Sequence, residues 1–466
     1  MMNTSSDPPQ SEKDAERNRS VSEPVKAESS PPTRRVSSDS PLNRIEKERR
    51  ASGNAVDIIL VKGKDGYYYS TPWHVMFSWS SFKTNAQAGV GDKIDVYVND
   101  RKLCYTMTLM EYGRCLFRPE ESSNFVPPAS TWERFPLVLD GEPNFVRFEH
   151  VRDSRSYIRV VECNLYVWDP EDFAIIADLD GTITIDDVGG HIRTLRLGQY
   201  DYIHEGSCEF FTKLQSLGAR ILYLTARPIN WASMSRVHLK EARQGDYKLP
   251  QGPVITNSLG LAGALFVEVV HKNPHIFKAG VLKQVEEAMH EGGRTSKHPV
   301  FVAGFGNRPT DVVAYKEAGV DVNCIFLINP TSTMTHSGDN SPEYESYTDP
   351  RALMWLLPKL KYKIPLEHFR KIDELTAQEI ERADEIEVRR IMLQQQQAQQ
   401  AAAIVEAKAA AANDAKAADA TDAKAADATD AKAADATDAK AAAATDAKAA
   451  AATDATAETV VDDTKA

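Results

Sequence analysis

The sequence Ile175-Ile176-Ala177-Asp178-Leu179-Asp180-Gly181-Thr182-Ile183-Thr184 decides the fold, because an apolar run ends there in two carboxylates one residue apart. The run over residues 173–177 predicts a buried strand. Gly181 permits a sharp turn, which lifts Asp178 and Asp180 to the carboxyl end of that strand, where open α/β sheets bind ligands. Two clustered carboxylates favour a divalent cation, whereas the alternative is a solvated acidic turn.

The composition bounds the class of protein. The chain has 466 residues, 42% of them hydrophobic, which suffices for about two or three domains. The absence of an apolar core in residues 1–30 predicts no signal peptide, and no run of about 18 apolar residues could span a bilayer. The net charge of −12 argues against direct nucleic-acid binding, so any membrane role is expected to be peripheral.

Cysteine usage indicates the redox compartment. No CxxC or paired spacing occurs, which predicts reduced thiols in a cytosolic or nuclear protein. The five cysteines are Cys104, Cys115, Cys163, Cys208 and Cys324.

The amino-terminal segment, residues 1–53, is rich in Ser, Pro, Glu and Arg. We expect it to be disordered because it cannot bury enough apolar surface. It holds candidate sites for protein kinases, namely the basophilic sequences that end at Ser37 and Ser52 and the Ser-Pro pairs at Ser30 and Ser40. Phosphorylation there would add charge beside a basic cluster and weaken its attraction to anionic lipid.

Two stretches that precede the Asp178 loop are rich in strand signals. Residues 54–118 form the first, residues 119–136 are a Ser/Pro/Glu linker, and residues 137–170 form the second. The pattern predicts an all-β, immunoglobulin-like sandwich. The expected strands are 56–61, 73–79, 93–98, 114–118, 135–139, 144–148, 157–161 and 164–168.

Residues 171–362 alternate strands and helices, which predicts a doubly wound, mostly parallel, Rossmann-like sheet. Helices are expected over 204–217 and from Pro309 to just before Gly319. Strands are expected to end at Ala177, Leu224, Phe305 and Ile328.

The carboxyl-terminal part carries no candidate chemistry. Residues 363–412 are charged and Gln-rich and predict a helix, with apolar positions too irregular for a coiled coil. Residues 413–466 contain an Ala/Asp/Lys/Thr repeat, which we expect to be a solvated, disordered tail because these residues cannot form a core.

Asp178 and Asp180 are the candidate catalytic residues. Hydrolysis of a phosphomonoester by carboxylates requires a nucleophile, an acid for the leaving oxygen, a cation and further donors. Asp178 would supply the nucleophile and form an aspartyl-phosphate. Asp180 lies on the same side of the turn and can protonate the leaving alkoxide and then activate water.

Three further side chains are candidates for binding the phosphoryl group. Thr182 belongs to the carboxylate loop, and Thr225 follows the next strand, where its hydroxyl either binds a phosphoryl oxygen or satisfies its own backbone. Lys278 lies on the apolar stripe of a helix that starts near Pro274. We therefore expect it to bind a buried anion, unless it extends past its neighbours into solvent.

Asn307 and Asp311 follow the strand over 300–305 and are candidate metal ligands. Oxygen atoms from one of them, with Asp178 and the main-chain carbonyl of Asp180, would make an octahedral Mg²⁺ site. Asp311 alternatively serves as an early-helix charge favoured by the helix dipole.

Residues 178–182 resemble the nucleophile loop of haloacid dehalogenase-like phosphatases, and roughly residues 54–118 and 137–345 resemble the lipins, the phosphatidate phosphatases of that superfamily. Leu-Pro-Gln-Gly-Pro at 249–253 favours lipins specifically, because generic phosphatase chemistry does not require it. The resemblance implies one sandwich assembled from residues 54–170, with two separate β modules as the alternative. The matching segments are 54–59, 70–77, 141–148, 165–168, 178–192, 225–227, 249–253, Lys278 and 304–311.

The resemblance implies a Mg²⁺-dependent phosphatidate phosphatase of glycerolipid and triacylglycerol synthesis, which releases diacylglycerol and phosphate. It also implies a cytoplasmic protein, peripherally bound to the endoplasmic reticulum or nuclear membrane, with a nuclear pool. The spacing from Thr182 to Thr225 leaves no room for an independent cap, so a membrane could present the phosphate. The alternatives are a noncatalytic phosphatidate-sensing lipid-binding protein and a phosphatase for a different phosphomonoester or phosphoprotein.

The chain departs from the lipin pattern in three places. Residues 1–53 contain no amphipathic helix of the kind with which lipins usually begin. Residues 77–81 lack two glycines of the lipin loop, and the tail has no tryptophan-bearing motif. We therefore expect membrane contact through another feature, such as an exposed apolar edge or the basic cluster at 44–50.

Overall fold

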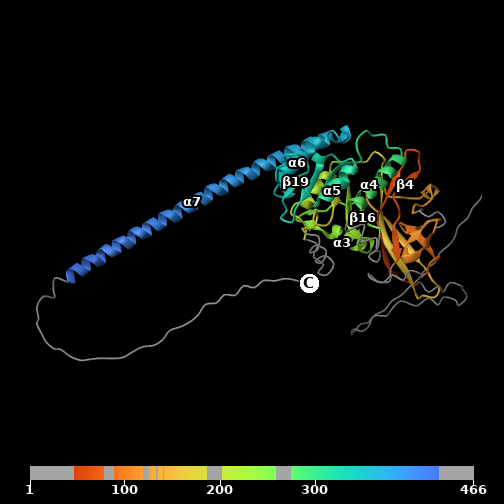
Figure 1. Cartoon of the computed structure of the whole chain (residues 1–466), viewed down its shortest axis with the longest axis horizontal. Helices are drawn as coiled ribbons and strands as arrows, with labels where there is room; N and C mark the ends of the chain where they lie inside the picture. Colours follow the sequence, from red (N-terminus) through yellow and green to blue (C-terminus); the bar gives the residue numbers. More distant parts are fainter. Residues whose placement is uncertain are drawn as a thin grey trace, which may run out of the picture.

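The computed structural model describes residues 47–77, 89–118, 125–132, 135–139, 141–185, 202–258 and 274–429. They form an α/β unit packed against a β-rich unit, and one long helix extends away from both (Figure 1). The expected kinase sites at Ser30, Ser37 and Ser40, most of the loop at 77–81, and residues 430–466 of the tail lie outside the described residues.

The α/β unit contains a six-stranded sheet with the strand order β16-β13-β12-β17-β18-β19. Neighbouring strands are parallel except for the last pair. All residues of the central strand β12 are buried, as a strand with helices over both sheet faces requires. The predicted parallel sheet is confirmed. The strands are β12 (Ala174–Asp178), β13 (Arg220–Pro228), β16 (Val254–Asn257), β17 (Phe301–Gly306), β18 (Ile325–Ile328) and β19 (Met334–His336).

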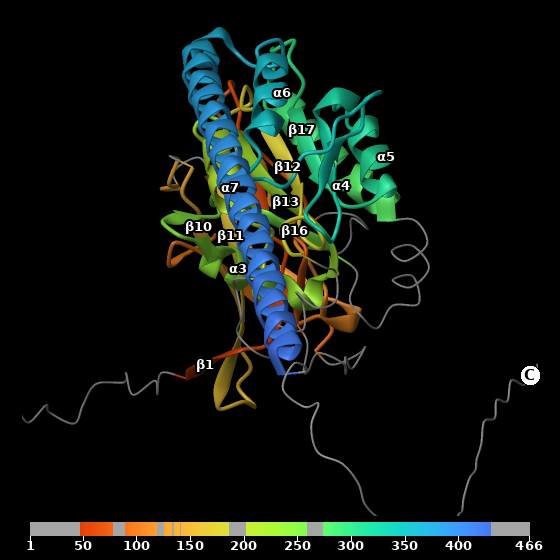
Figure 2. The same ribbon diagram turned by 90° about the vertical axis from the view of Figure 1, so that its left-hand side faces the viewer.

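Helices cover both faces of this sheet. In Figure 2, α4 and α5 lie on one side of β12 and β17, and α6 and α7 lie on the other. The helix α5 begins at Pro309, as predicted, because proline at the first helical position sacrifices no hydrogen bond. The helix α2 is shorter than the predicted 204–217, since Gly206 precedes it in a left-handed conformation. The helices are α2 (Ser207–Gln215), α3 (Ala232–Glu241), α4 (Pro274–Glu291), α5 (Pro309–Glu317) and α6 (Pro350–Leu360).

The β-rich unit joins both strand-rich stretches in one nine-stranded sheet. Its main order is β4-β3-β11-β10-β6-β8-β9, so strands from 144–168 lie between strands from 58–98. The alternative of two separate modules is wrong, whereas the immunoglobulin-like description stays a prediction. The strands are β1 (Glu48–Ala51), β3 (Ile58–Lys62), β4 (Tyr68–Ser70), β6 (Lys93–Val98), β7 (Arg101–Lys102), β8 (Met107–Leu109), β9 (Cys115–Leu116), β10 (Asn144–His150) and β11 (Tyr157–Trp168), with a separate ribbon of β2 (Gly53–Ala55) and β5 (Val75–Phe77).

Three boundaries within this unit differ from expectation. The prediction of disorder up to residue 53 is wrong at its end, because residues 48–51 already form the strand β1, which pairs in parallel with β11. The expected strands 157–161 and 164–168 form the single strand β11. Residues 135–139 form no strand, since Pro136 lacks a backbone N–H and the side chain of Asn144 binds the backbone of Val138.

The strand β3 connects the two units through its alternating side chains. Ile58 and Leu60 belong to the core of the β-rich unit. Ile59 and Val61 belong to the core of the α/β unit. Successive side chains of a strand point to opposite faces, so β3 is buried on both sides and holds the two units together as one body.

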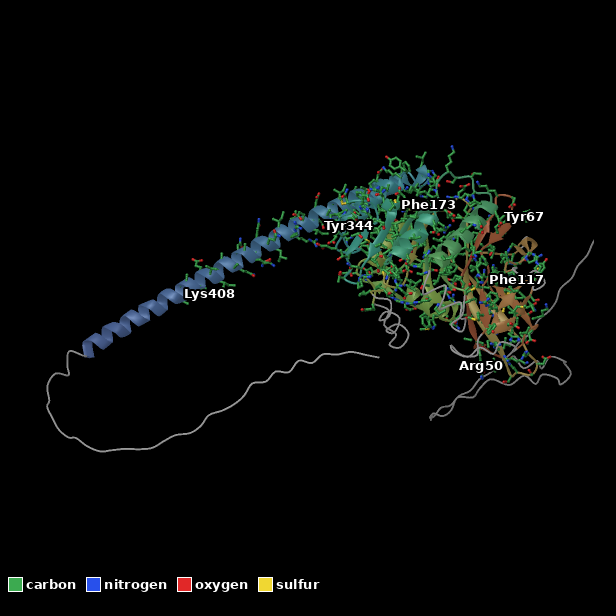
Figure 3. All side chains as sticks on the ribbon, in the orientation of Figure 1. Arg50, Tyr67, Phe117, Phe173, Tyr344 and Lys408 are labelled. Carbon is green, nitrogen blue, oxygen red and sulfur yellow. The ribbon has the colours of Figure 1, made fainter. Side chains whose placement is uncertain are left out.

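The last helix, α7 (Phe369–Thr429), extends the predicted helix into the repeat. Its first turns pack on the α/β unit through Ile372 and Leu375, whereas residues 384–411 are exposed. Figure 3 shows Lys408 far from the body of the molecule. None of the described helices is both long and apolar enough to cross a membrane.

Candidate active site

Asp178 is the last residue of β12 and lies at the carboxyl edge of the sheet. Its neighbours across the sheet belong to β13 and β17, which end at the same edge. Gly181 has a φ of 73°, which an L side chain rarely adopts, and its N–H donates to Thr184 Oγ1 at 3.0 Å. The predicted strand and glycine turn are therefore confirmed, and they place both carboxylates at this edge.

Lys278 binds two carboxylates at once. Its Nζ atom lies 2.8 Å from Asp178 Oδ1 and 2.7 Å from Asp311 Oδ1. All three residues are at most 5% exposed, so no solvent separates the charges. The lysine therefore has buried anionic partners, as its position on the apolar stripe of α4 predicts, and the alternative of a solvent-directed lysine is wrong.

Asp311 anchors the loop after β17 as well as Lys278. Its Oδ2 atom accepts the backbone N–H groups of Asn307 and Arg308, at 3.1 and 3.0 Å. Gly306 allows this approach, because a Cβ atom there would lie 2.6 Å from Cβ of Asp311. Asp311 therefore also lies in the first turn of α5, as the alternative role of an early-helix charge requires. Both of its carboxylate oxygens have protein partners.

Asp180 faces β13, where two side chains bind it. The hydroxyl of Thr225 donates to Asp180 Oδ2 at 2.9 Å. The guanidinium of Arg227 lies along the same carboxylate, with Nη2 2.6 Å from Oδ1. In this structure, Thr225 therefore positions Asp180 beside the place expected for a phosphoryl group.

Thr182 lies in the carboxylate loop and is fully buried. Its hydroxyl has no hydrogen-bond partner among the described residues, so it is available to a ligand. The hydroxyl of Tyr347 donates to the Thr182 carbonyl at 3.0 Å and thereby holds the loop.

Sequence reasoning missed Arg227 and Tyr347. Arg227 had a usable signal, because residues two apart on a strand share one face and Thr225 was already a candidate. Tyr347 had none, because it reaches the loop from a separate part of the chain.

Burial dominates the electrostatics of the site. It raises the pKa of Asp178 to about 7, with Lys278 opposing and Asp311 reinforcing the rise. Burial alone would lower the pKa of Lys278, but Asp178 and Asp311 hold it above its usual value. Buried carboxylates of this kind are stabilised by additional positive charge.

Carboxylates outnumber cationic side chains at the site, which favours a further cation. Three carboxylates, Asp178, Asp180 and Asp311, face only two cationic side chains, Lys278 and Arg227. No group of three His, Cys, Asp or Glu side chains within the described ranges could hold a metal ion. A cation would therefore need amide or main-chain oxygens as well, which Mg²⁺ accepts.

Comparisons with known proteins match two regions of the chain to one family. Residues 136–354 match the family described as LNS2 (Lipin/Ned1/Smp2), and residues 44–131 match the lipin N-terminal conserved region. The chain is 36% identical over 210 residues to a human protein named phosphatidate phosphatase LPIN1. It is 37% identical over 175 residues to phosphatidic acid phosphohydrolase 1 of Saccharomyces cerevisiae, and 34% over 194 residues to phosphatidate phosphatase PAH1 of Arabidopsis thaliana.

These matches cover parts of each protein. They span 45%, 36% and 42% of this chain and 23%, 20% and 21% of the human, yeast and plant proteins, respectively. The matched family region from 136 to 354 includes every candidate catalytic, phosphate-binding and metal-binding residue described above.

Proposed function

This chain belongs to the lipin family, and on that premise we propose that it hydrolyses phosphatidate to diacylglycerol and phosphate in a Mg²⁺-dependent reaction. The observation that carries the proposal is the convergence of Asp178, Asp180 and Lys278 at one sheet edge. A noncatalytic lipid sensor would need neither the carboxylate pair nor a buried lysine between two carboxylates.

Asp178 is the nucleophile in this proposal. Its attack on phosphorus forms an aspartyl-phosphate and releases the diacylglycerol oxygen. Lys278 lies 2.8 Å from Asp178 Oδ1, where its ammonium orients the carboxylate and stabilises charge on the phosphoryl oxygens. The hydroxyl of Thr182, which has no partner among the described residues, and the hydroxyl of Thr225 are the proposed neutral donors to the phosphoryl group.

Asp178, the main-chain carbonyl of Asp180 and Asn307 are the proposed Mg²⁺ ligands. Asp311 is the weaker candidate, because Lys278 and two backbone N–H groups already engage its oxygens. Bound Mg²⁺ would neutralise charge on the phosphoryl group.

Asp180 is the proposed acid and base. Its carboxyl gives a proton to the leaving alkoxide as the P–O bond breaks. It then takes a proton from the water that hydrolyses the aspartyl-phosphate, so one turnover restores its starting state. The substrate resides in a lipid bilayer, so we place the reaction at a membrane surface, with the enzyme bound peripherally.

The test is phosphate release from phosphatidate in mixed micelles, with Mg²⁺ or with a chelator. Wild type should be active only with Mg²⁺. Asp178→Asn should release phosphate at least about 10³-fold more slowly than wild type, because no aspartyl-phosphate can form. The matched control, Asp153→Asn, changes an exposed aspartate in the β10–β11 loop and should retain full activity.

Two outcomes would reject the proposal. If wild type cleaved soluble phosphomonoesters or a phosphopeptide but not phosphatidate, the substrate assignment would be wrong. If it bound phosphatidate micelles without releasing phosphate at any Mg²⁺ concentration, the noncatalytic lipid-binding function would replace it.

A further inference from the structure

Arg227 makes the densest set of contacts to the proposed acid and base. Its Nη2 atom lies 2.6 Å from Asp180 Oδ1, and its Nε atom lies 3.0 Å from Oδ1 and 3.1 Å from Oδ2. The planar guanidinium therefore lies along the edge of the carboxylate and restrains its rotation. A compact ammonium group could not make this fork-like contact.

The other side of Arg227 is held by α3. Its Nη1 atom donates to the Ser235 hydroxyl at 3.0 Å, and Ser235 is fully buried. The Arg227 side chain is only 5% exposed, whereas that of Asp180 is 21% exposed. The arginine is thus a fixed buried support, and the carboxylate that it holds reaches solvent.

The two oxygens of Asp180 are held differently. Oδ1 receives the shortest contact from Arg227, whereas Oδ2 receives the Thr225 hydroxyl and only the longer contact from Nε. A phosphoryl oxygen that accepts the Thr225 hydroxyl would release Oδ2 from that bond and leave Oδ1 anchored.

From this geometry we infer that Arg227 is a positioning residue, which anchors Asp180 through Oδ1 so that Oδ2 exchanges the proton with the leaving oxygen. This inference rests on the proposed phosphatase function. The proton on Oδ2 passes to the diacylglycerol oxygen as the P–O bond breaks, and Oδ2 regains a proton from the attacking water. Arg227 itself neither gains nor loses a proton.

A rival role for Arg227 is direct binding of the substrate phosphate, and the two roles differ in kinetics. A phosphate ligand contributes to substrate binding, so its removal raises KM. A residue that orients the acid acts mainly in the transition state, so its removal lowers kcat and leaves KM nearly unchanged.

The experiment compares Arg227→Ala, Arg227→Lys and Ser235→Ala with wild type on phosphatidate and Mg²⁺. Arg227→Ala should lower kcat about 100-fold with KM within about twofold, since general acid–base catalysis contributes 10²–10⁴-fold. Arg227→Lys should recover only part of the loss, and Ser235→Ala should lower kcat about threefold to tenfold. Added guanidinium ion should partly restore Arg227→Ala, a readout that a purely structural role would not produce.

Arg220→Ala is the matched control. Arg220 begins the same strand at the opposite edge of the sheet and pairs with Asp172 at 2.8 Å. Its removal should leave kcat and KM within about twofold of wild type, because the pair lies away from the site.

The inference is overturned if Arg227→Ala raises KM at unchanged kcat, or if it leaves both KM and kcat unchanged. It is also overturned if added guanidinium restores no activity to Arg227→Ala and Arg220→Ala is equally impaired. If Arg227→Ala does not fold, Ser235→Ala and Arg227→Lys decide by the same KM and kcat criteria. Inactive wild type would instead reject the phosphatase function itself, so the two failures remain distinguishable.

Discussion

The carboxylate of Asp57 lies 3.1 Å from Nη1 of Arg236, and this ion pair joins the β-rich unit to α3 of the α/β unit. Asp57 also accepts the backbone N–H groups of Asn164 and Val254, at 2.8 and 3.0 Å. Burial raises the pKa of Asp57, and Arg236 opposes that rise. The pair lies one residue from Ser235, so the β-rich unit supports the helix that holds Arg227.

Asp57→Ala should destabilise the protein by about 3–5 kcal/mol, because it removes the counter-charge of the largely buried Arg236 and leaves two backbone N–H groups without their acceptor. Denaturant unfolding measures this loss. Asp373→Ala is the control, since that helical aspartate side chain is 63% exposed in its pair with Lys361 and its removal should lower the free energy of unfolding by less than about 1 kcal/mol. Equal losses for the two variants would contradict the supporting role of Asp57.

Lys278→Ala should lower phosphate release about 10²–10³-fold, because it removes the buried cation between Asp178 and Asp311. Initial rates on phosphatidate with saturating Mg²⁺ measure the effect. Lys283→Ala changes a lysine on the same helix whose side chain is 74% exposed, and it should remain active. An active Lys278→Ala enzyme would remove this lysine from the mechanism.

Gly252→Ala should destabilise the protein by about 2 kcal/mol or more, because overpacking forces the backbone apart. A Cβ atom at Gly252 would lie 2.0 Å from the carbonyl oxygen of Ile221, whereas one at Gly280 would meet no atom of the described residues within 4 Å. Gly280→Ala, in the middle of α4, should therefore stabilise by about 0.5–1 kcal/mol. Thermal melting of both variants checks the prediction. An unchanged melting temperature for Gly252→Ala would show that the backbone at residue 252 can move away from Ile221.

Glu171→Gln should destabilise the protein at neutral pH by about 1 kcal/mol, the value expected for a partly exposed ion pair. Burial would raise the pKa of Glu171, but Lys64 together with Thr295 and Ser296 lowers it to about 2 from 4.5. Because the pKa of Glu171 is lower in the folded state than in the unfolded state, its ionised form stabilises the fold at pH values above the unfolded pKa. This stabilisation is lost as the pH falls toward 2.

The difference in stability between wild type and Glu171→Gln should therefore be constant above about pH 5 and shrink below it. Denaturant titrations at a series of pH values measure it. A difference that grew toward low pH would have the wrong sign for this ion pair.

A chain ended after residue 383 should keep its activity, with a melting temperature within about 2 °C of the full chain, because residues 384–411 are exposed. Ile372→Ala, at a fully buried position of the same helix, should instead lower the free energy of unfolding by about 2–5 kcal/mol. Melting curves and phosphate release test both. A large loss on truncation would show that the exposed part of α7 has a partner.

Local patterns predicted much of the fold. The buried run before Asp178 predicted β12, and proline and glycine predicted the limits of α5. The division of the β-rich strands was less predictable. The strand β11 has 12 residues and pairs with β10 and β3 on its two sides, so neighbouring strands, rather than local turn signals, determine its length.

The sequence by itself determined the candidate residues for the chemistry. Asp178, Asp180, Thr225 and Lys278 were recognisable because strand ends, a glycine turn and a helical stripe are local features. Only the tertiary structure decided their partners. Lys278 joins Asp178 to Asp311, and Arg227 holds Asp180, since parallel strands bring distant segments to one edge and burial leaves a charge stable only beside its counter-charge.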